Sequence, residues 1–212
     1  MAFDLAEPQN NRPEYGAGVA TGLSGLQRIP PMPRYVAFLR AINVGGHTVK
    51  MDLLRELFGE LRFSGVETFI ASGNVVFSTT SLATEALESR IESRLARALG
   101  YDVATFVRLA SALPAIGAVR PFAASGTTPE GCSLWVGFLK AAPAADARRR
   151  FEALSSDLDE LRIDGREAYW SSRTKMSESA VSSARLEKML GSPVTFRNVT
   201  TVMKLAATYA VA

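Results

Sequence analysis

The chain has one histidine, His47, and one cysteine, Cys132, among its 212 residues. A single cysteine excludes an intramolecular disulfide, and the shortage of both residue types excludes a zinc site built mainly from them. A Ser-His-acid triad would have to use His47, yet no Gly-x-Ser-x-Gly elbow is present, nor is a Walker A or Gly-x-Gly-x-x-Gly pattern. We therefore expect no histidine-dependent or P-loop catalysis, no metal and no cofactor, and interpret Cys132 as an ordinary buried thiol.

Long hydrophobic runs and an excess of charge of one sign are also missing. No apolar stretch approaches the ~20 residues that span a bilayer, and the start, MAFDLAEPQN, has an acid where a secretory signal has a basic region. Lys and Arg number 24 against 21 Asp and Glu, a formal charge of +3. That balance favours small anionic ligands over a long nucleic acid, which needs a basic stripe. These absences predict a cytoplasmic protein with no membrane partner.

Residues 1–33 are rich in proline and glycine and show neither helical nor strand periodicity. Such a segment buries too little apolar surface to offset the entropy lost on ordering. We expect a disordered N-terminal extension, and an upstream choice of start codon before Met32 would explain the same pattern. Hydrophobic residues make up 47% of the sequence, enough for one large domain or two small ones.

From residue 34 onward, strand and helix signals alternate. YVAFLRAI is an apolar run typical of a central strand. KMDLLRELFGEL predicts a helix whose apolar face includes Leu53, and Gly73-Asn74 between two apolar runs indicates a hairpin. A second amphipathic helix ends at Gly100, and DVATFVRL is a further strand. This order, β-α-β-β-α-β, predicts a ferredoxin-like unit over residues 34–120.

Residues 131–212 repeat the same order of signals. WVGFLKA at 135–141 matches YVAFLRA at 35–41, and LEKMLGSPVTF at 186–196 matches LARALGYDVATF at 95–106 with one residue deleted. The sequence therefore predicts an α+β protein of two tandem β-α-β-β-α-β units, related by internal duplication and packed as one compact body with a trailing helix.

Four blocks of sequence carry a resemblance to a known family: FLRAINVGG, MDLLRELF, FIASGNVVF and LEKMLGSPVTFRNVTTVMKL. They are similar to the signature blocks of the DUF1697 family of uncharacterised proteins, over roughly residues 34–208. The resemblance agrees with the duplicated fold and implies little about function. The family usually has glycine at Ala41, Ser-Lys at Thr174-Lys175 and an aromatic residue at Val199, so this chain departs from it at those points.

Three polar clusters are candidates for a ligand site. The first follows the first strand, where two glycines before a helix suit an anion or form an ordinary strand-to-helix turn. The second flanks Gly73, where an ordinary hairpin explains the residues equally. The third opens the last helix, where a threonine can cap the N-terminus and an arginine and a lysine add charge. The candidate ligand residues are Arg40, Asn43, Gly45, Gly46, Ser72, Asn74, Lys175, Thr195, Arg197, Asn198, Thr200, Thr201 and Lys204.

These clusters predict binding of a phosphate-containing small molecule or nucleotide where the two halves meet. Within one half the first and third clusters lie at opposite ends of the sheet, so only loops of different halves can form a shared site. Hydrolysis or transfer of a phosphate ester or acyl phosphate is an alternative that rests on fold analogy alone. A second alternative is an RNA-binding or protein-interaction module, for which Trp135, Phe138, Tyr169 and Trp170 are the candidate stacking residues. Catalysis and the oligomeric state stay open at this point.

Overall fold

The first half of the chain forms a four-stranded antiparallel sheet in the strand order β2-β3-β1-β4, with two helices packed on it. The computed structural model describes residues 32–42, 48–70, 73–80, 83–119, 131–174 and 182–210. In this half the elements are β1 (Arg34–Leu39), α1 (Met51–Glu60), β2 (Ser64–Thr68), β3 (Asn74–Ser78), α2 (Thr84–Leu99), β4 (Thr105–Leu109), a short 3-10 turn (Ala110–Ala112) and α3 (Leu113–Ala118).

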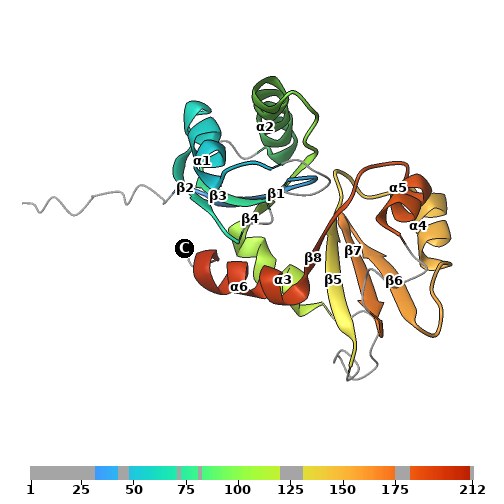
Figure 1. The fold of residues 1–212 in the computed structure, drawn as a ribbon. Helices are drawn as coiled ribbons and strands as arrows, with labels where there is room; N and C mark the ends of the chain where they lie inside the picture. Colours follow the sequence, from blue (N-terminus) through green and yellow to red (C-terminus); the bar gives the residue numbers. More distant parts are fainter. Residues whose placement is uncertain are drawn as a thin grey trace, which may run out of the picture. The chain divides into compact units, whose positions relative to one another are not determined.

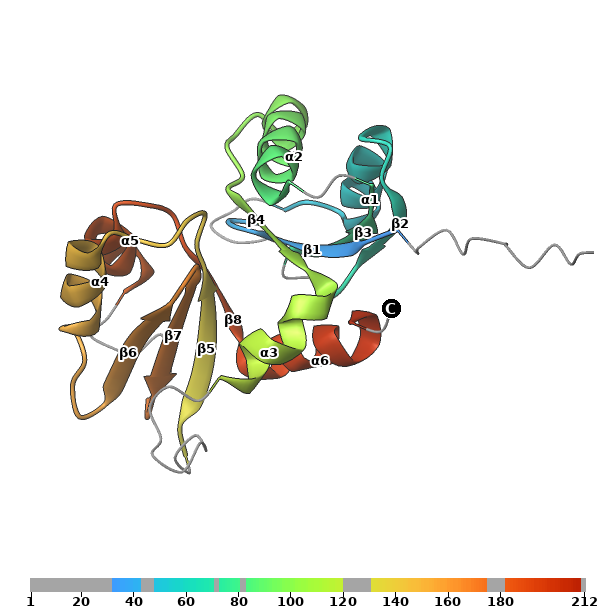
Figure 2. The same cartoon turned by 180° about the vertical axis from the view of Figure 1, so that it is seen from behind.

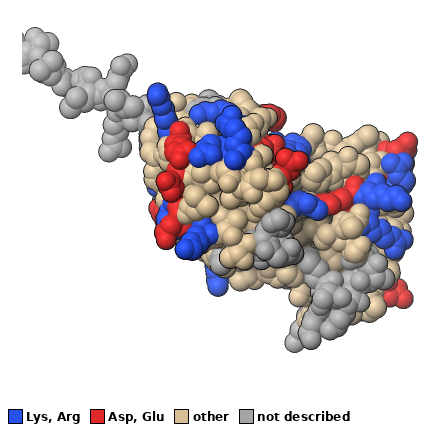
Figure 3. Space-filling model, turned by 45° about the horizontal axis from the view of Figure 1, so that its top comes forward, with Lys and Arg blue, Asp and Glu red and all other residues tan. Residues whose placement is uncertain are grey.

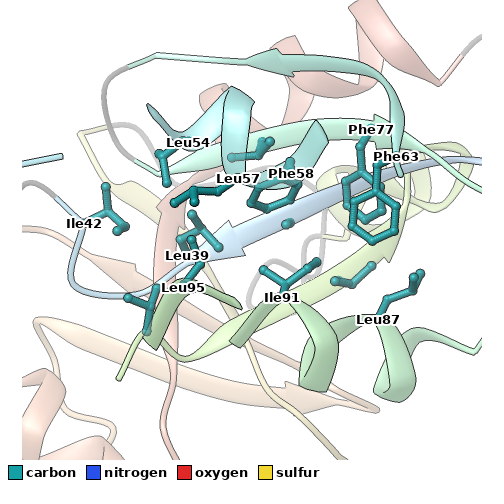
Figure 4. Packing of buried hydrophobic residues seen from close by; sticks show 14 of the residues in the cluster. Leu39, Ile42, Leu54, Leu57, Phe58, Phe63, Phe77, Leu87, Ile91 and Leu95 are labelled. Atoms are coloured by element: carbon teal, nitrogen blue, oxygen red, sulfur yellow. The ribbon is translucent and has the colours of Figure 1, made fainter. Parts of the chain in front are cut away.

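The helices α1 and α2 cover one face of this sheet (Figure 1) because their apolar stripes have the helical spacing. Figure 4 shows Leu54, Leu57 and Phe58 of α1 meeting side chains from β1, β3 and α2. Leu53, which the sequence places on the same face, is 36% exposed, because it lies one position away from the buried stripe. Gly100 ends α2 with φ +79°, as the sequence predicts.

The second half repeats the arrangement with the order β6-β7-β5-β8. Its apolar core lies between this sheet and α4 and α5, and includes Leu139, Phe151 and Trp170. The elements are β5 (Ser133–Phe138), α4 (Ala145–Glu152), β6 (Asp159–Asp164), β7 (Glu167–Ser172), α5 (Ser183–Leu190), β8 (Thr195–Asn198) and α6 (Val199–Tyr209). The protein is thus α+β, with two four-stranded antiparallel sheets in two similar units that pack together.

A shared core joins the two halves. It contains Val36 and Phe38 of β1, Val136 and Phe138 of β5, and apolar residues of β4, α3 and α6. Phe38 and Phe138 stack with their ring centroids 3.8 Å apart and their planes 8° apart. The helices α3 and α6 lie side by side in both views (Figures 1 and 2), so the last helix of the chain packs on an element of the first half.

Strand pairing corrects the alignment of the two halves. The sequence match equates Phe106 with Phe196, whereas Phe38 pairs with Phe106 and its counterpart Phe138 pairs with Thr195. A shift of one residue turns every side chain to the other face of a sheet. In the structure the counterpart of Arg197 is therefore Arg108, because each lies opposite the matching valine of the central strand.

Side chains of the chain itself accept the outward N–H groups of two sheet edges, β4 and β6, and one N–H beside a third, β8. The outward N–H groups of β4 at Thr105 and Val107 donate to Glu92 and Glu88. Those of β6 donate to Ser156, Ser155 and Glu152, and the N–H of Val194, just before β8, donates to Glu187. Occupied N–H groups cannot pair with another chain, so these bonds protect the edges.

The predicted N-terminal extension lies outside the described residues. Pro31–Ala212 forms one compact unit of the chain. In the described part of the chain, no helix has the length and apolar character that crossing a bilayer requires.

Candidate functional site at the junction of the two halves

Arg197 of β8 reaches across the junction to the first half. Its Nε donates to Oδ1 of Asn74 at 2.7 Å, and its Nη2 donates to the carbonyl oxygens of Leu39 at 2.8 Å and Gly73 at 3.4 Å. Within the second half, Nη1 donates to Oγ1 of Thr195 at 2.8 Å and to the carbonyl of Phe196 at 2.9 Å. The predicted residues Asn74, Thr195 and Arg197 therefore come together, and the end of β1 lies beside them.

Burial shapes the electrostatics of this group. Arg197 is 9% exposed, and desolvation lowers the pKa of its guanidinium to about 10. The group still carries its charge at neutral pH because its pKa lies well above 7. Its carbon Cζ lies 5.9 Å from the ring centroid of Phe38, so one face of the guanidinium plane stacks on the shared core.

Arg108, in the first half, forms the corresponding hydrogen bonds with the second half. Its Nε donates to Oε1 of Glu167 at 2.6 Å, and its Nη2 donates to the carbonyl oxygens of Leu139 at 2.9 Å and Arg166 at 3.1 Å. Leu139 is the counterpart of Leu39, and Arg108 lies over Phe138 as Arg197 lies over Phe38. Burial lowers the pKa of Arg108 as well, although Glu167 opposes that effect. Each of the two arginines thus extends from one half and forms hydrogen bonds with the other.

A second reciprocal pair stands beside each arginine. Arg40, directly after β1, forms a bidentate pair with Glu187 of α5 at 2.7 and 2.8 Å. Its counterpart Lys140, directly after β5, pairs with Glu92 of α2 at 2.5 Å. Because the two halves match at these contacts, we name the two sides of the junction by their arginines. The Arg197 end contains Leu39, Arg40, Gly73, Asn74, Glu187 and Arg197, and the Arg108 end contains Glu88, Glu92, Arg108, Leu139, Lys140, Arg166 and Glu167.

The two ends differ in charge. Asn74 and Glu167 occupy matching positions, since each pairs with the matching phenylalanine of the central strand, so an amide meets Arg197 where a carboxylate meets Arg108. The Arg108 end also contains Glu88, which is 2% exposed and lies 3.9 Å from Arg108 and 3.4 Å from Lys140. Burial is the largest influence on this carboxyl and raises its pKa. The Arg108 end is therefore richer in carboxylates.

The loops differ as well. The connection after β1 covers residues 40–50, against 139–144 after β5, and the first hairpin turn covers 69–73, against 165–166 in the second half. Ala41 and Ile70, in the two longer loops, have φ values of +61° and +58°. Positive φ costs a side chain with a Cβ about 1–2 kcal/mol. Both longer loops belong to the Arg197 end, whereas Arg62, which also has a positive φ (+59°), lies in the turn between α1 and β2.

The other predicted residues are dispersed. Asn198 caps α6, with its Oδ1 accepting from the N–H of Thr200 at 2.9 Å, so it takes the role expected of a threonine because β8 runs directly into the helix. Thr200 and Lys204 are exposed on α6, Thr201 is half-buried, and no described contact joins these three to Arg197. The predicted residues Asn43, Gly45, Gly46, Ser72 and Lys175 lie outside the described residues.

The candidate stacking residues for RNA belong to the protein interior. Phe138, Tyr169 and Trp170 are at most 1% exposed, and Trp135 is half-buried. On the face shown in Figure 3, basic and acidic side chains are interspersed and form no area of a single sign. The structure therefore gives no exposed aromatic platform in the part of the chain that it describes. Cys132 is half-buried just before β5, less enclosed than the sequence suggests.

Two surface depressions and clusters of possible metal ligands were also considered as candidate sites. One depression of about 380 Å³ lies beside Glu92 and Asp102, and another of about 370 Å³ lies beside Glu152 and Arg162. Neither is lined by a predicted ligand residue. Among the described residues, no three histidine, cysteine or carboxylate side chains are placed to hold a metal ion.

Sequence reasoning missed the contribution of Arg108, Lys140 and Glu187 to the junction. The match of Arg40 with Lys140 between the repeats is visible in the sequence and was the signal for one reciprocal pair. Arg108 was hidden by the one-residue shift between sequence match and strand register. Glu187 has no sequence signal, because a glutamate on a helix is ordinarily a solvated surface residue.

Comparisons with known proteins identify a family and a fold. A search of the curated proteins found no match. The structure of the conserved bacterial protein SP0830 from Streptococcus pneumoniae is similar, with a TM-score of 0.65 and 22% identity, and the match covers 85% of this chain and 99% of that one. The family model described as "Protein of unknown function (DUF1697)" matches residues 32–169. Together with the sequence blocks, this match shows that the chain belongs to the DUF1697 family.

Proposed function

We propose that the protein binds a small phosphate-containing anion at the Arg197 end of the junction. The supporting observation is the difference between two ends whose arginines make matching contacts across the junction. The Arg108 end holds the halves together with short loops and carboxylates, and so represents what the junction needs for stability. The Arg197 end has features that a stable junction does not require. These are its longer loops, the positive φ of Ala41 and Ile70 within them, and Asn74 where the other end has Glu167. Excess loop length and local strain of this kind concentrate at binding sites.

The charges of the Arg197 end favour an anion. Arg40 has a side chain that is 42% exposed, so a ligand can reach it from solvent. Arg197 lies deeper and presents a second guanidinium beside an amide. Guanidinium groups form charge-assisted hydrogen bonds to phosphate oxygens. The Nε and Nη2 of Arg40 are bonded to Glu187, so an anion would meet its other edge or displace Glu187, whereas all three nitrogens of Arg197 are bonded to acceptors of the protein. We therefore assign first contact to Arg40 and long-range attraction to Arg197.

The alternatives are less well supported. Hydrolysis of a phosphate ester needs an amide or a base to orient water. The amide of Asn74 bonds to Arg197 and to the carbonyl of Phe69, and Asn198 caps α6. Binding without catalysis is therefore the simpler proposal. RNA binding would need an exposed aromatic surface, whereas the four candidate aromatic residues lie in cores. A protein-interaction module stays as the outcome if no small anion binds.

A pair of matched variants tests the proposal. Thermal unfolding and calorimetric titration are measured with inorganic phosphate, pyrophosphate, nucleotides and short RNAs for the wild type, Arg40→Gln and Lys140→Gln. Each variant removes one charge at the junction: Arg40→Gln removes the pair with Glu187, and Lys140→Gln removes the pairs with Glu92 and Glu88. A ligand at 100 times its Kd stabilises the fold by ~2.7 kcal/mol. We expect that stabilisation to disappear in Arg40→Gln and to persist in Lys140→Gln.

Three results would contradict the proposal. Unchanged unfolding with every compound would indicate a protein partner. Equal loss of binding in both variants would indicate a general charge effect. A response to RNA alone, with a length requirement and a steep dependence on salt, would favour the nucleic-acid alternative.

A further inference from the structure

The two ends of the junction differ in the described ion pairs and hydrogen bonds that join the halves. At the Arg108 end the halves are joined by ion pairs between Arg108 and Glu167, between Lys140 and both Glu88 and Glu92, and between Arg166 and Glu85. Arg108 is almost completely buried. Separating a buried charge from its partner leaves it uncompensated in a poorly solvated place, which strongly opposes opening.

At the Arg197 end the halves are joined by different contacts. Its described cross-half ion pair is the one between Arg40 and Glu187, whose side chains are 42% and 19% exposed. Arg197 adds hydrogen bonds to neutral oxygens of Leu39, Gly73 and Asn74. Water can replace neutral acceptors at a smaller cost than it can replace a buried carboxylate. The stacked rings of Phe38 and Phe138 lie between the two arginines.

We propose that the junction opens at the Arg197 end while the Arg108 end stays closed. The phenylalanine stack and the carboxylate-rich end then act as the pivot, and the separating end is the route by which a ligand enters. The opening itself follows from the contacts alone. That an anion closes it rests on the proposed function. Regions of few and water-exchangeable contacts open at lower free energy than the rest of a fold.

The two arginines provide a matched measurement of this opening. The Nε–H proton of Arg197 is bonded to Asn74 at 2.7 Å and that of Arg108 to Glu167 at 2.6 Å, so both report directly on a cross-half bond. Their exchange with solvent is measured by NMR on the full chain, with signals assigned from Arg197→Lys and Arg108→Lys. We expect the Arg197 proton to exchange at least about tenfold faster. Equal rates, or a faster Arg108 proton, would overturn the proposal.

A variant separates opening of the whole end from motion of one side chain. Arg40→Gln removes the Arg40–Glu187 pair and leaves in place the described acceptors of Arg197, namely Asn74 and the carbonyl oxygens of Leu39 and Gly73. Collective opening predicts faster exchange at Arg197 and no change at Arg108, and an unchanged Arg197 rate would refute it. Inorganic phosphate then tests the anion separately. Slower exchange at Arg197 supports both proposals, whereas a persisting difference that phosphate does not alter upholds the opening and contradicts anion binding.

Discussion

At the scale of single residues, the backbone conformation of Ala41 bears on one departure from the family pattern. The DUF1697 family usually has glycine here, and the structure gives Ala41 a φ of +61°. Glycine adopts positive φ without a steric penalty, whereas the Cβ of alanine approaches the following carbonyl. The position therefore requires the backbone conformation that glycine provides, and this chain accepts local strain beside Arg40.

Relieving this strain is a direct test. Ala41→Gly is expected to raise the free energy of unfolding by about 0.5–1 kcal/mol, because the gain at positive φ exceeds the entropy that glycine adds to the unfolded chain. Ala141 is the matched control, since it is the counterpart in the second half and does not have positive φ. Ala141→Gly should destabilise by up to about 1 kcal/mol. Denaturant titrations measure both, and equal effects would contradict strain at Ala41.

Glu88 gives a prediction about pH. Burial raises the pKa of this carboxyl above its ordinary value near ~4.3, so the folded protein holds the proton to higher pH than the unfolded chain does. Its contribution to stability is present below the unfolded pKa and is lost as pH rises through the folded pKa. Glu88→Gln keeps an acceptor for the N–H of Val107. We expect wild-type stability to fall relative to this variant as pH rises above the ordinary pKa of a glutamate, and a relative rise would show that ionised Glu88 stabilises the fold.

At the scale of elements, the sequence predicts most of the architecture. Apolar spacing locates the helices, and Gly100 and Gly191 end two of them with positive φ. The sequence alignment of the two repeats differs from the strand pairing by one residue, because Thr-Phe recurs in both halves but pairs differently. Local composition does not determine which side chain of a short strand faces which layer, since that depends on packing against the other half.

One glycine tests how closely β5 and β8 pack. A Cβ on Gly137 would lie 2.6 Å from Cε1 of Phe196, whose ring also contacts Trp170. Gly137→Ala should therefore destabilise by about 1–3 kcal/mol through overpacking. Gly59→Ala in α1 is the control, because no heavy atom lies within 4 Å of its added Cβ. It should stabilise by about 0.5–1 kcal/mol. Thermal unfolding that shows no loss for Gly137→Ala would mean that Phe196 moves aside freely.

At the scale of the whole molecule, the shared core makes the two halves depend on each other. Phe38 is fully buried and stacks on Phe138 of the other half. Phe38→Ala should lower the free energy of unfolding by about 3–5 kcal/mol. Both tryptophans, Trp135 and Trp170, lie in the second half and report on it by fluorescence. We expect the fluorescence and circular-dichroism midpoints to shift together. A fluorescence midpoint that stays in place would show that the second half unfolds independently.

The candidate site was predictable in part. Arg40, Asn74, Thr195 and Arg197 were proposed from the sequence and lie at one end of the junction. The contacts of Arg197 with Asn74 and Leu39 depend on how two sheets meet, which no local pattern encodes. Thr200, Thr201 and Lys204 were grouped with Arg197 by closeness in the chain, but α6 carries them into another element. Chain proximity predicts spatial proximity poorly where a strand ends and a helix begins.

The most direct test of the central claim is Asn74→Asp, which places a carboxylate beside Arg197 as Glu167 lies beside Arg108. The new carboxylate would lie where Oδ1 now accepts from Arg197 at 2.7 Å, and the bond to the carbonyl of Phe69 would be lost. We expect stability to change by no more than about 1 kcal/mol, because a stronger ionic hydrogen bond offsets the lost one. Phosphate stabilisation should disappear, since the carboxylate repels the anion. Retained phosphate binding in a folded Asn74→Asp protein would contradict the assignment of the ligand site to the Arg197 end.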